Sequence, residues 1–105
     1  MADFDLSNLL GMAQRMQEQM ASLQGELAQK TVEASAGGGM VTAVASGARE
    51  IVRITIDPAV DLSDRAMLQD LVVAACNAAL RQAQKLAREE MSKLAGGLPL
   101  PPVLF

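Results

Sequence analysis

The sequence TVEASAGGGMVTAVASGAREIVRITIDP, residues 31–58, contains three short runs that are rich in Val, Ile and Thr. Gly37-Gly38-Gly39 separates the first two runs, and Ser46-Gly47-Ala48 separates the last two. Glycine can adopt the positive φ values of tight turns, so each glycine segment is suited to connect two antiparallel strands. The pattern predicts three strands over about residues 31–57, joined by two successive hairpins and ended by Asp57-Pro58, because proline cannot continue the pairing.

The segment before the strands, residues 5–30, follows a heptad pattern of apolar side chains. We call the apolar positions the heptad seam; they are Leu6, Leu9, Ala13, Met16, Met20, Leu23 and Leu27. Their alternating spacing of three and four residues predicts a long helix from about residue 5 to about residue 30, with a narrow apolar side. Such a seam needs a second helix to pack against, either from the same chain or from another copy.

The segment after the strands predicts a second helix from about residue 63 to about residue 94, with Ser63 as its N-cap. Its first half, residues 68–80, has hardly any polar face, and a helix of that kind is buried on several sides. Three short strands and one helix offer too little surface to cover it, so we expect a second copy to cover the rest. Two glycines end the helix, and residues 96–105 are an apolar, proline-rich tail for which we expect a polyproline-like conformation.

The predicted order of elements is α-β-β-β-α, in a single domain over residues 1–105. The fold class is α+β, with a three-stranded antiparallel sheet and two long helices in each subunit. Because both helices need more apolar surface than one chain offers, we expect the subunits to form an intertwined homodimer.

The composition of the 105 residues excludes several classes of protein: there is no His, Trp or Tyr, and Cys76 is the one cysteine. Without His or paired Cys, the side chains of catalytic triads and of most zinc sites are missing, so we expect no enzyme, metal, cofactor or small-molecule substrate. A lone cysteine and an N-terminus without a signal-like segment indicate the cytoplasm. No apolar run approaches the roughly 20 residues of a membrane span, so we expect no membrane partner.

Two other patterns allow a ligand-binding interpretation beside a structural one. The glycine segment at residues 37–39 lacks the glycine spacing, helix and Lys of a phosphate-binding loop, and we interpret it as a hairpin turn. Asp57, Asp61, Asp64 and Asp70 cluster around the start of the second helix, where carboxylates can bind Mg²⁺ or Ca²⁺. Capping and the helix dipole account for Asp64 and Asp61 but not for Asp70.

The basic residues give the candidate binding surface. Arg81, Lys85 and Arg88, here called the basic stripe, recur at i, i+4 and i+7 and therefore project from one side of the second helix. The formal net charge is −3, so the chain would bind nucleic acid only through such a local patch. The stripe is either a solvated helix face or, duplicated in a dimer, a surface for the phosphates of a duplex. On charge alone, the candidate residues of such a surface are Arg81, Lys85, Arg88, Arg49 and Arg53, with Arg15 and Lys93 as secondary candidates.

Four separated motifs resemble one known family: Ala36-Gly37-Gly38-Gly39-Met40-Val41, Ile54-Thr55-Ile56-Asp57-Pro58, DLVVAACNAA at residues 70–79, and Gly97-Leu98-Pro99-Leu100-Pro101. With its Met- and Gln-rich opening at residues 12–17, the chain resembles the YbaB/EbfC family of bacterial nucleoid-associated proteins. The resemblance implies a cytoplasmic, nucleoid-located homodimer that binds double-stranded DNA, alters its conformation, and contributes to nucleoid organisation and gene regulation. The shared motifs are mainly glycines, prolines and apolar residues, so the resemblance transfers no binding residue.

The alternative function is a dimeric protein–protein interaction module without direct DNA binding. The acidic charge balance and the apolar C-terminal tail favour this alternative, because such a tail can dock a partner chain. For a DNA-binding protein, we expect low sequence preference and a steep dependence of affinity on salt, since phosphates are then the main contacts.

Overall fold

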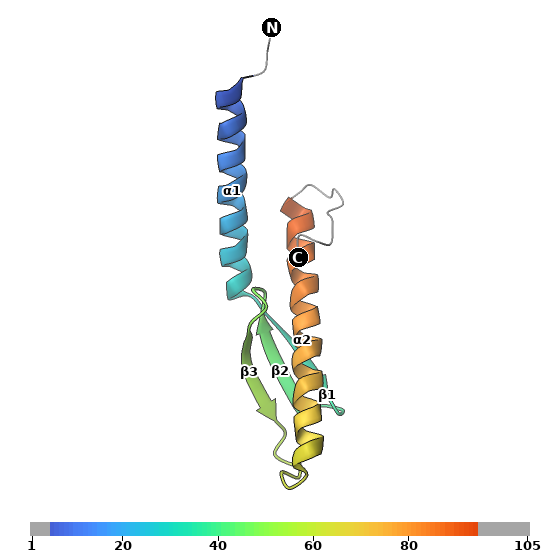
Figure 1. Ribbon diagram of the computed structural model, residues 1–105. Helices are drawn as coiled ribbons and strands as arrows, with labels where there is room; N and C mark the ends of the chain where they lie inside the picture. The colour runs from blue at the N-terminus through green and yellow to red at the C-terminus, as the bar shows by residue number, and fades with distance from the viewer. Residues whose placement is uncertain (1–4, 95–105) are drawn as a thin grey trace.

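The computed structural model describes residues 5–94 and shows two long helices with a small sheet in the predicted order (Figure 1). The elements are α1 (Leu6–Gln29), β1 (Thr31–Ala36), β2 (Val41–Ser46), β3 (Ile51–Ile56) and α2 (Arg65–Leu94). The predicted α-β-β-β-α architecture is therefore confirmed for the protomer. The predicted tail at residues 96–105, with the two glycines at its start, lies outside the described residues.

The sheet is a meander in which β2 is the central strand, paired antiparallel with β1 on one side and with β3 on the other. Ala43 of β2 lies opposite Ala34 of β1 and opposite Ile54 of β3. A bulge between Val44 and Ala45 shifts the register at the beginning of β3. The sheet therefore follows the two predicted hairpins in sequence order.

The two hairpin turns obtain their left-handed backbone from different residues. The three glycines at residues 37–39 have positive φ values between 65° and 97°, whereas in the second turn Arg49 has a φ of 64°. The second turn is held by the backbone N–H of Arg49, which donates to the carbonyl oxygen of Ser46 at 2.9 Å. Gly47 has no space for a side chain, because a Cβ there would lie 2.5 Å from the carbonyl oxygen of Leu27. The turn and the end of α1 therefore meet backbone to backbone.

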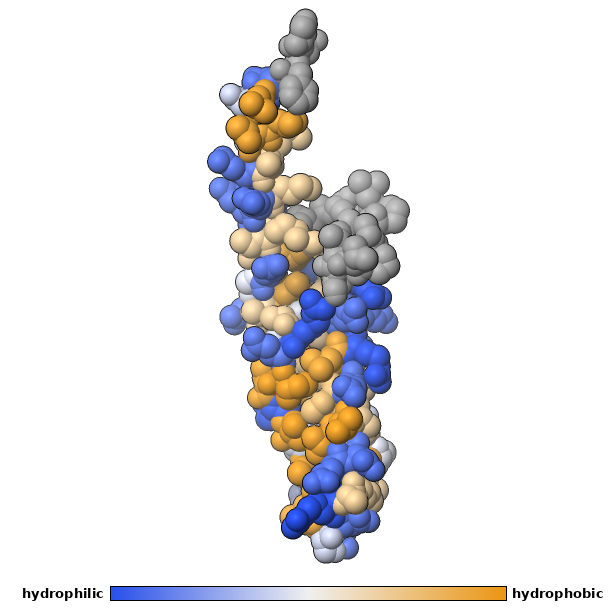
Figure 2. Space-filling view, in the orientation of Figure 1, coloured by the Kyte–Doolittle hydropathy of each residue, from blue (hydrophilic) through white to orange (hydrophobic). Residues whose placement is uncertain are grey.

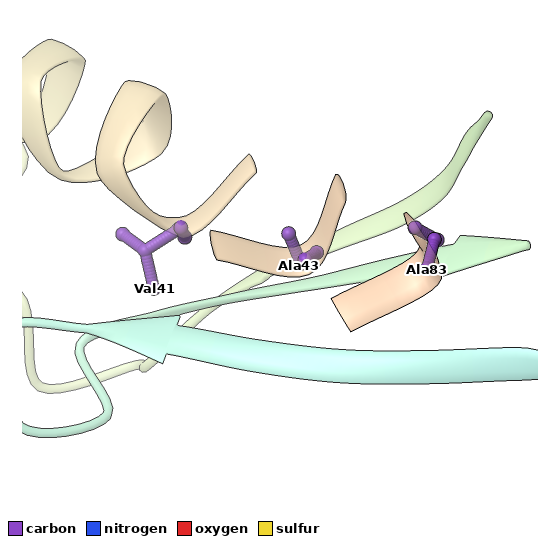
Figure 3. Packing of buried hydrophobic residues seen from close by; sticks show 6 residues of the cluster. Val41, Ala43 and Ala83 are labelled. Atoms are coloured by element: carbon purple, nitrogen blue, oxygen red, sulfur yellow. The ribbon is translucent and has the colours of Figure 1, made fainter. Parts of the chain in front are cut away.

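The core lies between α2 and one face of the sheet, mainly over β1 and β2. Six residues of this core are completely buried: Val41, Ala43 and Ala45 of β2, and Ala75, Ala79 and Ala83 of α2. Figure 3 shows three of them, Val41, Ala43 and Ala83, between the strand and the helix. Five of the six are alanines, so the helix backbone lies close to the strands and the packed layer is thin.

β3 is left uncovered on the side of the sheet where α2 packs. The register places Ile54 and Ile56 opposite the buried Ala43 and Val41 on the same face, yet they are 42% and 37% exposed. Val73, on the half of α2 with few polar residues, is 59% exposed. An apolar strand face is normally packed against a core, so this surface is incomplete in a single chain.

Within the described residues, α1 packs against the rest of the protomer through its C-terminal end. Leu23 and Leu27 of the heptad seam are buried in a cluster with Ala87 and Met91 of α2. The rest of α1, residues 6–19, extends beyond the end of α2 as an arm (Figure 1). The radius of gyration is 19.7 Å, whereas a compact chain of this length has about 13 Å.

The helix starts are capped by aspartates. The carboxylate of Asp5 accepts a hydrogen bond from the N–H of Ser7 at 3.0 Å, at the start of α1. At the start of α2, the carboxylate of Asp64 accepts from the N–H of Met67 at 3.2 Å. The prediction of Ser63 as N-cap was therefore wrong by one residue, because the Ser63 hydroxyl instead donates to Asp61 at 2.7 Å.

Candidate nucleic-acid interface

The basic stripe, Arg81, Lys85 and Arg88, lies on the exposed side of α2. Two residues turn an α-helix by about 200°, and the buried Ala79 and Ala83 precede Arg81 and Lys85 by two positions. The stripe therefore points away from the sheet. Alanine, arginine, lysine and glutamine are strong helix formers, so the same segment supplies the buried side and the basic side of one regular helix.

The dimensions of the stripe suit the backbone of a nucleic acid. Arg81 and Arg88 are about 10 Å apart along the helix axis, since each residue adds about 1.5 Å. One strand of duplex DNA carries a phosphate about every 3.4 Å along its axis, so about three phosphates span the same length. In Figure 2, hydrophilic side chains gather over the C-terminal half of α2, where the stripe lies.

Within residues 5–94, the ion pairs are formed around Glu90, and no ion pair neutralises the charges of the stripe. The Glu90 Oε1 atom lies 2.9 Å from Nζ of Lys30 and 3.7 Å from Nζ of Lys93. The hydrogen bond from Lys30 is the main reason that the pKa of Glu90 lies below its ordinary value. Lys93, a secondary candidate, is therefore partly neutralised, whereas the stripe can bind anions.

The two strand-associated candidates lie apart from the stripe. Arg53 of β3 lies opposite Val44, and its neighbour Ile54 points to the side of α2, so Arg53 lies on the opposite face of the sheet. Arg49 lies in the turn between β2 and β3 and lines a groove beside the end of α1. Arg15 is exposed on the α1 arm. The structure therefore brings together three of the five candidates and separates the other two from them.

The loop before the N-terminal end of α2, far from the stripe, is acidic. The glycine turn at residues 37–39 forms one wall of a groove of about 420 Å³, which Asp57 and Asp61 also line. Each carboxylate is engaged in its own loop: Asp57 accepts from the N–H of Ala59 at 2.8 Å, and Asp61 accepts from Ser63. The Ser63 hydrogen bonds lower the pKa of Asp61. Carboxylates here repel phosphate, which supports the interpretation of the glycines as a turn.

Residues 5–94 contain neither a metal-binding cluster nor a membrane-spanning helix. In this part of the chain, no group of three His, Cys, Asp or Glu residues is placed to hold a metal ion. Neither of the two described helices is long and apolar enough to cross a membrane. Cys76 is half-buried and packs against the alanine core.

The surface that sequence reasoning missed is the apolar face of β3. Figure 2 shows hydrophobic side chains over the sheet, and the exposed members include Ile51, Val52, Ile54 and Ile56. In the sequence, Val52, Ile54 and Ile56 alternate with Arg53 and Thr55, which predicts one buried face for this strand. The pattern did not show that the chain's own helix would cover only the neighbouring strands.

The model of the family described as the "YbaB/EbfC DNA-binding family" matches residues 1–98, a range that includes every candidate residue.

Similar proteins agree with this match. The chain is 53% identical over 102 residues to a "nucleoid-associated protein" of Acetivibrio thermocellus, covering 96% of this chain and 90% of the relative. It is 52% identical over 99 residues to a nucleoid-associated protein of Thermoanaerobacter sp. (strain X514), covering 93% and 89%. A crystal structure of a Helicobacter pylori protein shares the fold, with a TM-score of 0.77 and 23% identity, covering 88% of this chain and 98% of that chain.

Proposed function

Because this chain belongs to the YbaB/EbfC DNA-binding family, we propose that it binds double-stranded DNA in the nucleoid as a homodimer. Two similar proteins that carry the name nucleoid-associated protein support this location. The structural observation that carries the proposal is the basic stripe, three cations on the outer side of α2 without an ion pair among residues 5–94.

The stripe is suited to phosphates rather than to bases. Guanidinium and ammonium groups form charge-assisted hydrogen bonds with phosphate oxygens, and these contacts position a protein without reading sequence. The interface therefore has low sequence preference. Its affinity falls steeply with salt, because each neutralised phosphate releases condensed counterions.

A second copy of the chain completes both the fold and the interface. The exposed apolar face of β3 supports this step, and so does a radius of gyration far above that of a compact chain. Two-fold symmetry then presents the basic stripe twice at a fixed separation. A duplex that meets both stripes must adapt its path to that separation, which alters its conformation and supports a role in nucleoid organisation and gene regulation.

Arg49 and Arg53 form a second, separate contact in this proposal. They lie away from the stripe, so they meet a different part of the DNA or a second duplex. The family match favours DNA binding over the alternative of a module that binds only proteins. The family and the names of the relatives indicate DNA binding rather than catalysis.

The decisive experiment is a titration of a labelled duplex with the purified protein at about 50 mM and about 200 mM salt, with the mass in solution measured alongside. Six stripe cations per dimer give an expected slope of about −5 in log affinity against log salt, a loss of about 10³-fold between the two conditions. Absence of binding at the lower salt would overturn the proposal. Binding with little dependence on salt would overturn the phosphate contact.

A further inference from the structure

The heptad seam of α1 is covered at one end and bare at the other. Leu23 and Leu27 are 8% and 7% exposed because they pack with α2, whereas Leu9 and Met16 are 47% and 67% exposed. The apolar spacing is the same in both halves. Within residues 5–94, no other element covers the N-terminal half (Figure 1). We call its exposed positions the bare seam; they are Leu6, Leu9, Ala13 and Met16.

Apolar residues widen the bare seam on both sides. Each residue turns the helix by about 100°, which places Leu10 on one side of the seam and Met12 on the other. Both are exposed, at 58% and 60%. The charged residues of this arm, Arg15 and Glu18, lie on the opposite side of the helix. The arm therefore presents a broad apolar surface that carries no charge.

The α1 arm is also a weak helix when nothing packs against it. Isolated helices shorter than about 12–15 residues are marginal in water, and the arm spans only residues 6–19. Gly11 lies in the interior of the arm, where glycine is less favourable than alanine. Contact with a second apolar surface would stabilise the arm, because it buries the apolar side of the helix.

We propose that the bare seam binds the bare seam of a second copy of this chain, with the two arms antiparallel and a two-fold axis at the level of Gly11. In this register Leu6 faces the partner's Met16, and Leu9 faces the partner's Ala13. Each layer of the contact therefore contains two apolar side chains of the heptad, as knobs-into-holes packing requires.

The arm is complementary to itself in this arrangement. The axis at Gly11 brings the two copies of Leu10 to one side of the contact and the two copies of Met12 to the other. Coiled coils that join unlike chains select the partner by charges at the positions beside the seam. The arm has no charge there to select an unlike partner and none to repel a copy of itself. Those positions are Leu10, Met12, Gln17 and Gln19.

The position of α2 decides the direction of the arms. α2 packs on the seam at Leu23 and Leu27, with Met20 at the edge of the same cluster. A parallel partner helix in register with the bare seam would continue into the space that α2 occupies. The helix of an antiparallel partner begins at Leu6, beside Met16, and therefore leaves α2 in place. The bare seam and the antiparallel overlap have the same length.

This contact is separate from the dimer surface proposed above, and it uses neither DNA nor the basic stripe. Gly11 lies about 27 Å from the end of α1, at about 1.5 Å per residue, and β3 lies beyond that end (Figure 1). A two-fold axis at Gly11 therefore keeps the β3 strands of the two copies more than about 50 Å apart. The arms join the dimers that β3 forms. Two heptads make the weaker contact, which is lost on dilution.

The test is disulfide formation between arms of the full chain, without DNA. Cys76→Ala removes the native thiol, and Leu6→Cys and Met16→Cys are then made in separate chains. In the antiparallel contact these two thiols lie side by side, whereas two copies of either one are about 15 Å apart, beyond the reach of a disulfide. We expect mild oxidation to link most of an equimolar mixture as a heterodimer and to link neither chain alone.

A matched pair of substitutions tests the same surface by mass. Sedimentation of the parent at increasing concentration should show a rise from the mass of two chains toward the mass of four. Leu9→Glu places a charge in the bare seam and should abolish the rise, whereas Gln14→Glu places the same charge on the outer side of the arm and should not. Circular dichroism reports that each variant is folded.

Absence of the mixed disulfide would overturn the proposal, and so would a disulfide between two Met16→Cys chains, which requires parallel arms. A rise in mass that Leu9→Glu leaves unchanged would also overturn it. Ile54→Glu distinguishes this contact from the proposed dimer, because the mixed disulfide should persist when β3 no longer pairs. Failure of the proposed DNA binding would leave both measurements unaffected, since neither contains DNA.

Discussion

The Nζ atom of Lys30 lies 2.9 Å from Oε1 of Glu90, so the residue that ends α1 is joined to the C-terminal half of α2. The pair stands beside the small cluster of Leu23, Leu27 and Met91. Together, the ion pair and the cluster set the direction in which the α1 arm leaves the protomer.

Removing the charge of Glu90 should weaken this junction in a pH-dependent way. The pKa of Glu90 is lowered from 4.5 by the hydrogen bond with Lys30, and the pKa of Lys30 is raised from 10.5 by the same bond. The Glu90 contribution is therefore present above pH 4.5 and lost as the pH falls through the lowered pKa. The Lys30 contribution is present below pH 10.5 and lost as the pH rises through the raised pKa.

We therefore expect Glu90→Gln to lower the urea midpoint at about pH 7, and to lower it less as the pH falls below 4.5. Glu89→Gln removes a neighbouring charge outside the ion pairs and serves as the control. Equal effects of the two substitutions at about pH 7 would contradict the role of the pair. The effect is modest, because exposed pairs contribute little.

Gly47→Ala should destabilise the contact between the second turn and α1. A Cβ at this position would lie 2.5 Å from the carbonyl oxygen of Leu27, and a backbone atom cannot move aside cheaply. We expect a loss of about 1–3 kcal/mol in the free energy of unfolding, as for other overpacked sites. Gly25→Ala, within α1 and with nothing within 4 Å of its Cβ, should instead raise stability by up to about 1 kcal/mol. Urea unfolding of both variants gives the comparison, and a Gly47→Ala chain as stable as the parent would refute the close approach.

Ala79→Leu should disrupt the core because the helix and the strands are already in close contact. Ala79 is completely buried, so the added carbon atoms have no space. We expect the substitution to cost about 1–3 kcal/mol in thermal or urea unfolding. Ala74→Leu changes the same helix on its exposed side and should be close to neutral. If the two variants had the same free energy of unfolding, the close contact between α2 and the strands would be contradicted.

Replacement of Arg81, Lys85 and Arg88 by Ala should weaken duplex binding and reduce its salt slope by up to about 5 for a dimer, since about 0.9 is lost per phosphate contact. Arg81→Lys with Arg88→Lys keeps the charges and should keep most of the slope. Circular dichroism confirms the fold of each variant. An unchanged salt slope in the triple alanine variant would show that the stripe does not contact the DNA. Arg53→Ala then tests the second proposed contact, at Arg49 and Arg53.

Ile54→Glu should separate the subunits if β3 forms the dimer surface. Ile54 is 42% exposed in the single chain and lies on the same side of the sheet as α2, over the strand that α2 leaves uncovered. Sedimentation should give the 11.0 kDa of one chain for this variant and twice that mass for the parent. Thr55→Glu places the same charge on the opposite face of β3 and should leave the dimer intact. A dimer that survived Ile54→Glu would place the subunit contact on another surface.

The local elements could be predicted from the sequence because their signals are periodic. The heptad seam predicted α1, and the glycine segments predicted both hairpin turns. Long-range partners could not be predicted in this way. The spacing of four residues favours Glu26 as the partner of Lys30, but the fold brings Glu90 to the hydrogen bond. Likewise, nothing local indicated that Arg49 rather than Gly47 would adopt positive φ.

The candidate site could be predicted in part for the same reason. Helical spacing alone places Arg81, Lys85 and Arg88 on one side of α2, whatever the helix packs against. Strand alternation places Arg53 on the polar face of β3, also correctly. A protein with one helix layer on one sheet layer has two solvent-exposed faces, however. The sequence does not show that the basic stripe and Arg53 lie on different faces.

The thin alanine core has a consequence for how much folded protein a cell contains. Among the fully buried side chains of residues 5–94, the largest is Val41, so this part of the protomer draws little of its stability from its own interior. If the second copy supplies the missing cover over β3, folding becomes coupled to association and follows mass action. The fraction of folded, DNA-competent protein then rises with the amount synthesised, so expression level itself becomes a control on occupancy of the chromosome.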